Sequence, residues 1–215
     1  MAKKLLSLDL STSTGWALFD GRWKLETFGI FIEKPKSYKA EIKTYLDYPM
    51  AYPNNFIDCA TRVASQVDDL IEKHKPDAIV IEETNRGRQR FSQKLLEFIH
   101  FTTIGVLTKR EIKPLYLTQK CWRDSVGAYA TKEEKSWNAK VGRLKKKARA
   151  EGKVNAVGAL KPVKIDGEIA MRKSTKHFSL RVVKELYGIE LGIKENDQAD
   201  AILLGTAAWN LGLVE

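Results

Sequence analysis

The hydrophobic and polar pattern predicts strands early in the chain and helices later. Short apolar runs bounded by turns indicate strands, and the Asp20-Gly21 pair between the second and third runs is a hairpin signal. Apolar residues at helical spacing predict helices. Strands are expected at 4–10, 16–19, 23–32, 78–82 and 115–117, and helices at 54–74, 92–104, around Cys121-Trp122, 133–150, 174–187 and 197–211. This order predicts an α/β fold with a mixed sheet flanked by helices.

Local signals add detail to this outline. The run at 78–82 is apolar on both faces, which is typical of a central strand. Residues 35–53 are polar and rich in tyrosine, so a loop is expected there. Trp16 and Trp209 are expected in the core. The residues expected to cap helices are Asn54 or Asn55, Ser92, Ser174 or Thr175, and Asn196.

The composition is that of a globular protein. Of 215 residues, 43% are hydrophobic, and this length suits one domain or one domain with a large insertion. Two cysteines, Cys59 and Cys121, exclude a disulfide scaffold and disfavour a cysteine-based zinc site. Apolar runs are shorter than the about 20 residues that span a bilayer, and Ser7 and Asp9 interrupt any signal peptide. We expect a soluble, reduced protein of the cytoplasm, or of the host-cell cytoplasm if viral.

The net charge of +10 is concentrated in one segment. Residues 132–177 contain 14 basic and 5 acidic residues, so the rest of the chain carries only +1. Such a local excess favours a nucleic acid as partner over a merely solvated helix face. A membrane surface is less favoured, because the segment lacks a strong apolar stripe.

Two acidic residues stand on predicted strands. Asp9 lies in the first apolar strand, where an unpaired carboxylate is costly. It needs a metal ion, a basic partner or hydrogen bonds from the turn at residues 11–15. Glu82 ends the 78–82 strand. Side-chain alternation favours Glu82 over Glu83 for the face of Asp9, provided that the two strands are neighbours.

Two further acids open the last predicted helix. Asp197 and Asp200 are three residues apart and therefore share a helix face. Favourable charge at a helix N-terminus explains Asp197 well, but Asp200 is followed at once by an apolar run. Together with the two strand acids, they form an oxygen set that suits Mg²⁺ or Mn²⁺. A pair of such ions about 3.5–4 Å apart supports phosphodiester cleavage.

Three segments carry a resemblance to a known family. Leu8-Asp9-Leu10-Ser11 through Gly15-Trp16-Ala17, residues 75–82, and Asp197-Gln198-Ala199-Asp200-Ala201 match the RuvC-like Holliday-junction resolvases of the ribonuclease-H-like superfamily in order and spacing. The chain resembles this family over nearly its whole length, and the Asp-x-x-Asp-Ala of the last helix is the most specific segment.

The resemblance implies a single nuclease domain over residues 1–215. This domain has a five-stranded mixed sheet and a basic helical insertion at about 131–173. The resemblance also implies two Mg²⁺ ions, with Mn²⁺ able to substitute, and a homodimer that nicks two symmetric strands of a four-way DNA junction, leaving 5′-phosphates. The implied catalytic and metal-binding residues are Asp9, Glu82, Asp197 and Asp200.

Two departures from the family pattern concern junction recognition. RuvC-like enzymes usually carry an aromatic residue shortly after the glutamate, and this chain has Asn85 near that place. Phe91 is a candidate wedge, although a hydrophobic contact at the start of the next helix explains it at least as well. The basic insertion is also longer than in compact relatives. A phage-encoded or otherwise divergent member with relaxed specificity for branched DNA fits both departures.

Basic residues are expected to contact DNA through its phosphates. Those predicted to do so are Arg86, Arg88 and Arg90 after Glu82, Lys145, Lys146, Lys147 and Arg149 in the insertion, and Lys173 and Lys176 before the last helices. A structural or exposed role is favoured for His177. Trp137 either stacks on a base or sugar or packs under the insertion.

Two other functions remain open. Asp9 followed by Ser11, Thr12 and Thr14 also resembles the first phosphate-binding turn of actin-like ATPases and sugar kinases, which would indicate a phosphotransferase. The sequence has neither a second such turn nor a Gly-rich adenosine loop. A non-catalytic nucleic-acid-binding module is the other alternative. The acidic set argues against it, because unneeded carboxylates beside a DNA groove would repel the ligand.

Overall fold

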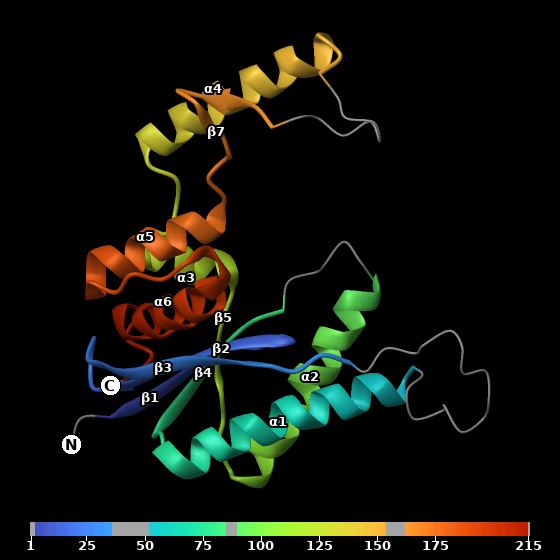
Figure 1. Cartoon of the computed structure of the whole chain (residues 1–215). Helices are drawn as coiled ribbons and strands as arrows, with labels where there is room; N and C mark the ends of the chain where they lie inside the picture. Colours follow the sequence, from blue (N-terminus) through green and yellow to red (C-terminus); the bar gives the residue numbers. More distant parts are fainter. Residues whose placement is uncertain (1–2, 36–51, 85–89, 154–161, 215) are drawn as a thin grey trace.

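The protein is built on one mixed β-sheet (Figure 1). A computed structural model describes residues 3–35, 52–84, 90–153 and 162–214. The strands are β1 (Lys4–Asp9), β2 (Ser13–Asp20), β3 (Leu25–Ile32), β4 (Ala78–Glu82) and β5 (Leu115–Leu117), in the order β3-β2-β1-β4-β5. The first three strands form an antiparallel meander, and β4 is parallel to both β1 and β5. The predicted α/β fold with a five-stranded mixed sheet is confirmed.

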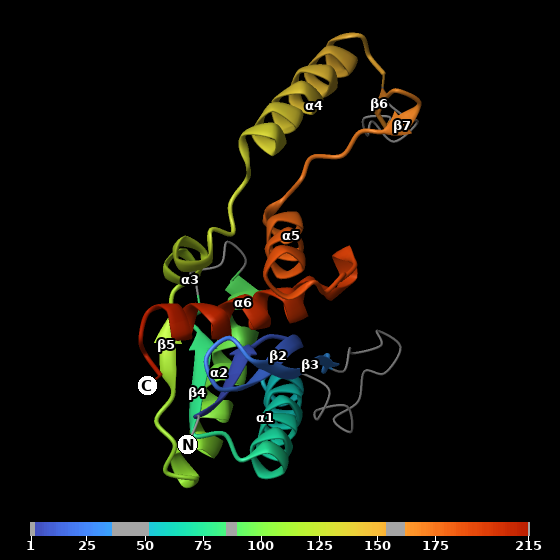
Figure 2. The ribbon, with the colours of Figure 1, turned by 90° about the vertical axis from the view of Figure 1, so that its left-hand side faces the viewer.

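Helices cover both faces of this sheet (Figure 2). One face packs against α1 (Asn54–His74) and α2 (Arg90–Lys109). The other face packs against α3 (Gln119–Val126), α5 (Thr175–Tyr187) and α6 (Asn196–Asn210). A 3₁₀ turn at Ile193–Glu195 directly precedes α6. Within the described ranges, no helix is both long and apolar enough to cross a membrane.

The central strand β1 is buried on both faces because each face has its own core. Leu6 and Leu8 pack toward α1 and α2, whereas Leu5 packs toward α6. On the α6 face, the hydroxyl of Ser7 donates a hydrogen bond to the carbonyl of Ala201 at 2.7 Å. Alternation along the strand therefore directs Asp9, at the end of β1, to the α6 face.

Helix starts are where the sequence prediction fails most often. Helix α1 begins at Asn54 with Pro53 as its cap residue, so neither Asn54 nor Asn55 is the cap. Helix α2 begins at Arg90, before Ser92, and α6 begins at Asn196 itself. Asparagine and serine also fit inside a first turn, and packing of the helix body decides where the helix starts. Ser174 is the cap residue of α5, as expected.

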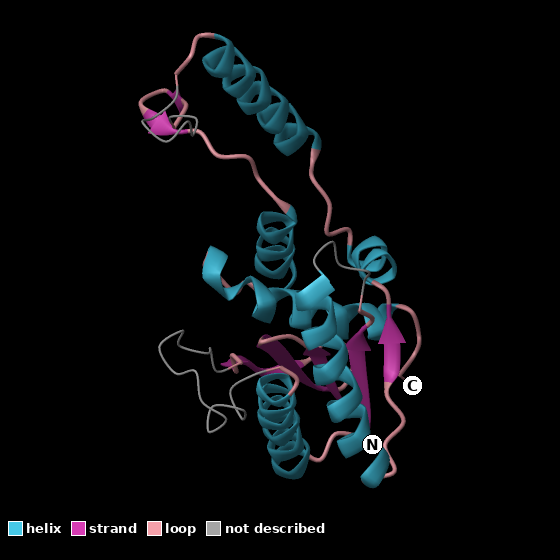
Figure 3. Cartoon of the chain, turned by 90° about the vertical axis from the view of Figure 1, so that its right-hand side faces the viewer, coloured by secondary structure: helices cyan, strands magenta, loops and turns pink. Residues whose placement is uncertain are grey.

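Residues 131–153 and 162–173 form an arm that projects from the α5 side of the sheet (Figures 2 and 3). We call this segment the basic arm. It contains α4 (Lys132–Ala150) and a small hairpin of β6 (Lys164–Ile165) and β7 (Glu168–Ile169). The hairpin was not expected from the sequence. Its turn, Asp166-Gly167, has positive φ at both residues (53° and 88°), as a two-residue hairpin of type I′ requires.

Candidate active site

The four predicted acids gather at one end of the sheet. Asp9 and Glu82 end the neighbouring parallel strands β1 and β4, so both lie at the same edge. In β4, Ile79 and Ile81 pack toward α1 and α2, whereas Val80 packs toward α6. Alternation therefore puts Glu82 on the α6 face, the face to which Asp9 is directed.

The start of β2 contacts the start of α6, which carries Asp197 and Asp200. Gly15 pairs with Asp9 across the two strands, and a Cβ at Gly15 would lie only 1.9 Å from the carbonyl oxygen of Asp197. This close approach of strand and helix requires a glycine. The hydroxyl of Ser13 donates a hydrogen bond to Oδ2 of Asp197 at 2.6 Å. The start of β2 thus contacts both the backbone and the carboxylate of Asp197.

Burial and repulsion from neighbouring acids raise the pKa of the carboxyl groups of Asp9, Glu82 and Asp200. For Asp9, burial is the largest cause, followed by the charges of Glu82, Asp200 and Asp197, and its pKa lies well above the usual value. Burial raises the pKa of Glu82 to about 7, against the lowering effect of a 2.8 Å hydrogen bond from Trp122 Nε1. Burial also raises the pKa of Asp200. The acids are therefore close enough to repel one another, and a cation among them would relieve that repulsion.

Arg123 of α3 supplies part of the compensating charge. Its side chain is 6% exposed, and Nη2 lies 3.4 Å from Oδ1 of Asp200. Nη1 donates to the hydroxyl of Ser179 at 3.3 Å, and the guanidinium lies 4.3 Å from the centre of the Trp122 ring. The sequence analysis missed Arg123. The available signal was a basic residue beside a tryptophan in the short helix after β5.

Asn196 and Lys176 extend the contacts around Asp197. Lys176 Nζ donates to Asn196 Oδ1 at 2.8 Å, which leaves the amide nitrogen of Asn196 to donate to Oδ1 of Asp197. Asn196 is 5% exposed, so this contact is buried. Lys176 was predicted to contact DNA. Its observed contact orients Asn196, and its charge also lowers the pKa of Asp200.

The donor set suits a divalent metal ion in its chemistry. The donors are carboxylate oxygens, which hard cations such as Mg²⁺ and Mn²⁺ prefer, and acidic neighbours raise the pKa of Asp9 and of Asp200. In the described part of the chain, however, no three His, Cys, Asp and Glu side chains are already arranged to hold a metal ion. The carboxylates would have to move closer together to bind the ion.

The raised pKa of Glu82 predicts how the metal-free protein responds to pH. The unfolded chain releases this proton near pH 4.5, but the folded chain keeps it to about pH 7. Between these values the folded state binds more protons, so raising the pH destabilises it, by roughly 3 kcal/mol in total. Thermal melts in EDTA at pH 5 and pH 8 measure this loss.

Glu82→Gln is the comparison that isolates the effect. Burial lowers the pKa of His74 and His100, so these groups change stability with pH in the opposite direction. The variant keeps both histidines and should lose the Glu82 contribution. Added Mg²⁺ should raise the melting temperature of the wild type more at pH 8 than at pH 5. An identical pH profile for wild type and variant would contradict this prediction.

The other predicted DNA-binding residues lie away from the acids or outside the described residues. Arg86 and Arg88 fall outside them, as does Asn85, and Arg90 and Phe91 are described only as the first residues of α2. Helix α4 of the basic arm carries the residues of the insertion that were predicted to contact DNA, which are Lys145, Lys146, Lys147 and Arg149. Lys173 lies at the base of the arm.

Two residues with open roles make structural contacts. His177 accepts a hydrogen bond at Nδ1 from the backbone N–H of Ser174, at 3.1 Å, and so helps to close the first turn of α5. Trp137 Nε1 donates to the carbonyl of Met171 at 2.8 Å. This contact supports packing under the insertion for Trp137. Trp209 is buried, as expected, and Trp16 packs against the core while half-buried.

Comparison with known proteins identifies the fold. No protein-family model and no curated protein matches the sequence. RuvC of T. thermophilus in complex with a Holliday junction substrate matches with a TM-score of 0.59 and 10% identity, covering 98% of this chain and 96% of that chain. A second structure of Thermus thermophilus RuvC matches with a TM-score of 0.57 and 11% identity, over the same shares of the two chains. The protein therefore has a RuvC-like, ribonuclease-H-like fold, as the resemblance implied.

Proposed function

We propose that this protein is a structure-specific DNA endonuclease that resolves Holliday junctions or other branched DNA by metal-dependent phosphodiester hydrolysis. The observation that carries the proposal is the gathering of Asp9, Glu82, Asp197 and Asp200 at one end of a RuvC-like sheet. One of the matching RuvC structures contains a Holliday junction substrate.

Three of the four acids are held in position by the sheet or by hydrogen bonds, as a catalytic role requires. Asp9 and Glu82 project from strand ends that the sheet holds rigidly, and Trp122 fixes the orientation of Glu82. Ser13 and Asn196 hold the two oxygens of Asp197. Bound among these residues, Mg²⁺ or Mn²⁺ would supply an activated water and would stabilise the leaving oxygen.

Arg123 balances the acidic cluster until a metal ion binds. It contacts Asp200 through a buried ion pair, and breaking one side of such a pair is costly because it leaves a buried charge unpaired. A metal ion near Asp200 would take over this role, leaving Arg123 with its contacts to Ser179 and Trp122.

The protein is proposed to act as a homodimer on four-way junctions, with the basic arm binding DNA. Two acid sites are needed to nick two symmetric strands. The phosphotransferase alternative requires a second nucleotide-binding domain, whereas a single RuvC chain matches 98% of this one. A non-catalytic nucleic-acid-binding module would give no reason for acids that repel one another to lie together.

Cleavage of a synthetic four-way junction tests the proposal. Each of the four strands is labelled in turn at its 5′ end, and the junction is incubated with Mg²⁺, with Mn²⁺ or with EDTA. We expect paired symmetric nicks that depend on the metal ion and leave 5′-phosphates. A linear duplex of the same sequence should be cut far more slowly. Cutting in EDTA, or equal cutting of the linear duplex, would refute the proposal, and scattered cuts would indicate a broader nuclease.

A further inference from the structure

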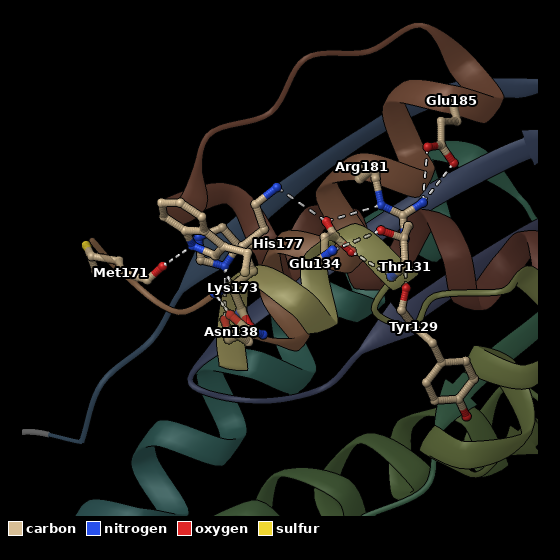
Figure 4. A network of polar contacts seen from close by, with 11 residues as sticks. Tyr129, Thr131, Glu134, Asn138, Met171, Lys173, His177, Arg181 and Glu185 are labelled. Carbon is tan, nitrogen blue, oxygen red and sulfur yellow. Dashed lines mark hydrogen bonds and ion pairs between the residues drawn. The ribbon is translucent and has the colours of Figure 1, made fainter. Parts of the chain in front are cut away.

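The base of the basic arm is held by contacts between its two ends (Figure 4). Asn138 of α4 forms two hydrogen bonds with the backbone of Lys173, one from its amide nitrogen to the carbonyl (2.8 Å) and one from the Lys173 N–H to its oxygen (2.7 Å). Beside it, Trp137 donates to the carbonyl of Met171. The segment that returns from the hairpin is therefore attached to the first turns of α4.

Glu134 is the charged centre of this base. It is 5% exposed, and its carboxylate accepts a hydrogen bond from the N–H of Thr131 at 3.0 Å, which caps α4. Its Oε1 also lies 3.6 Å from Nζ of Lys173 and 3.5 Å from Nε of Arg181 (Figure 4). One buried carboxylate thus contacts the start of the arm, its end, and helix α5. We call Glu134, Asn138, Lys173 and Arg181 the clasp.

Helix α5 connects the clasp to the candidate active site. Arg181 contacts Glu134 and also donates to the carbonyl of Tyr129 at 2.7 Å, so it holds the segment that leads into the arm. On the same helix, Ser179 contacts Arg123 and lowers the pKa of Asp200, and Lys176 contacts Asn196. One helix therefore sets both the direction of the arm and the surroundings of the acids.

We propose that the clasp holds the basic arm in a fixed direction relative to the active site, and that this direction makes the protein select branched over linear DNA. The proposal rests on the proposed nuclease function. Helix α4 is about 28 Å long at 1.5 Å per residue, so the basic residues of its last turns lie far from the base of the arm. A rigid arm can bind phosphates of a second duplex only at the angle that the clasp sets.

A free arm would behave differently. Its lysines and arginines would still attract phosphates, because that attraction depends on charge and not on a fixed orientation. Only a substrate that presents two duplexes at a particular angle gains from an arm that is already oriented, since binding then costs less ordering. The clasp is therefore expected to contribute to discrimination and to leave hydrolysis unchanged. Glu134 is a positioning residue in this scheme.

The Glu134→Gln variant tests the proposal. Glutamine can still cap α4 through its amide oxygen, but it cannot form ion pairs with Lys173 and Arg181. We expect faster hydrogen exchange at the Lys173 amide, about tenfold weaker junction binding, unchanged duplex binding, and an unchanged cleavage rate at saturating junction. Asn138→Ala, which frees the Lys173 backbone but keeps Glu134, should give the same pattern.

Glu133→Gln is the matched control, because it removes the same charge from the neighbouring exposed position. It should leave both the amide exchange and the preference for junctions unchanged. The proposed role of the clasp would be wrong if Glu134→Gln weakened junction and duplex binding equally, or if hydrogen exchange at the Lys173 amide stayed unchanged. A wild-type protein with no preference for junctions would instead overturn the proposed function, so the two failures are distinguishable.

Discussion

The Asp9→Asn variant is expected to bind a four-way junction as tightly as the wild type and to cleave it at less than about one hundredth of the wild-type rate. Loss of a residue that merely orients a metal ligand costs about 10- to 100-fold, and Asp9 is proposed to bind the metal directly. Binding should persist because removing a carboxylate near the phosphates removes repulsion. Gel-shift titrations in Ca²⁺ and cleavage assays in Mg²⁺ measure the two effects separately.

Asp9 is a better test than Asp200. Replacing Asp200 would leave Arg123 as an unpaired buried charge and would destabilise the fold. Replacing Asp9 should instead raise the melting temperature in EDTA, because it removes a carboxylate whose pKa is raised by burial and by three acidic neighbours. The control is Asp124→Asn, an exposed acid paired with Lys120 on α3. If Asp9→Asn loses binding together with cleavage, Asp9 is structural.

Replacing Lys145, Lys146 and Arg149 by glutamine should weaken junction binding and flatten its salt dependence. In the described chain, no ion pair joins these three residues of α4 to an acid, whereas Lys147 pairs with Glu151. Each phosphate contact contributes about 0.9 to the slope of log K against log salt, so losing three should reduce the slope by about 2 to 3. Binding titrations between low and moderate salt measure this slope.

The matched control removes three lysines from the other end of the sheet. Lys73, Lys109 and Lys113 are exposed and lie near the ends of α1 and α2 that precede β4 and β5, away from the acids. Their replacement by glutamine changes the net charge equally and should leave the slope nearly unchanged. If both triple variants lower the slope alike, the attraction is general and α4 does not contact the DNA.

The sequence was sufficient to predict the strands of the sheet and the positions of Asp9 and Glu82 on them. In β1, Leu6 and Leu8 alternate with Ser7 and Asp9, and strand geometry alone assigns these two sets to opposite faces. The same alternation, with parallel pairing to β1, was enough to choose Glu82 over Glu83. These inferences succeeded because they depend on local geometry and on one assumption about neighbouring strands.

Contacts between segments far apart in the chain could not be predicted from the sequence. Ser13 and Asp197 are 184 residues apart, and nothing local to either residue indicates their hydrogen bond. The ion pair of Arg123 with Asp200 depends likewise on how α3 packs against α6. The β6–β7 hairpin is a different case, because its Asp166-Gly167 signal was present in the sequence and was read only as a loop.

The double use of α5 has a consequence for protein engineering. Arg181 holds the arm, while Lys176 and Ser179 lie against residues that surround the acids. Transplanting residues 131–173 alone into another protein of this fold would leave behind helix α5, to which the arm is attached. A chimaera with junctions near residues 128 and 188 would carry the whole unit, and its recipient would need a surface complementary to α5.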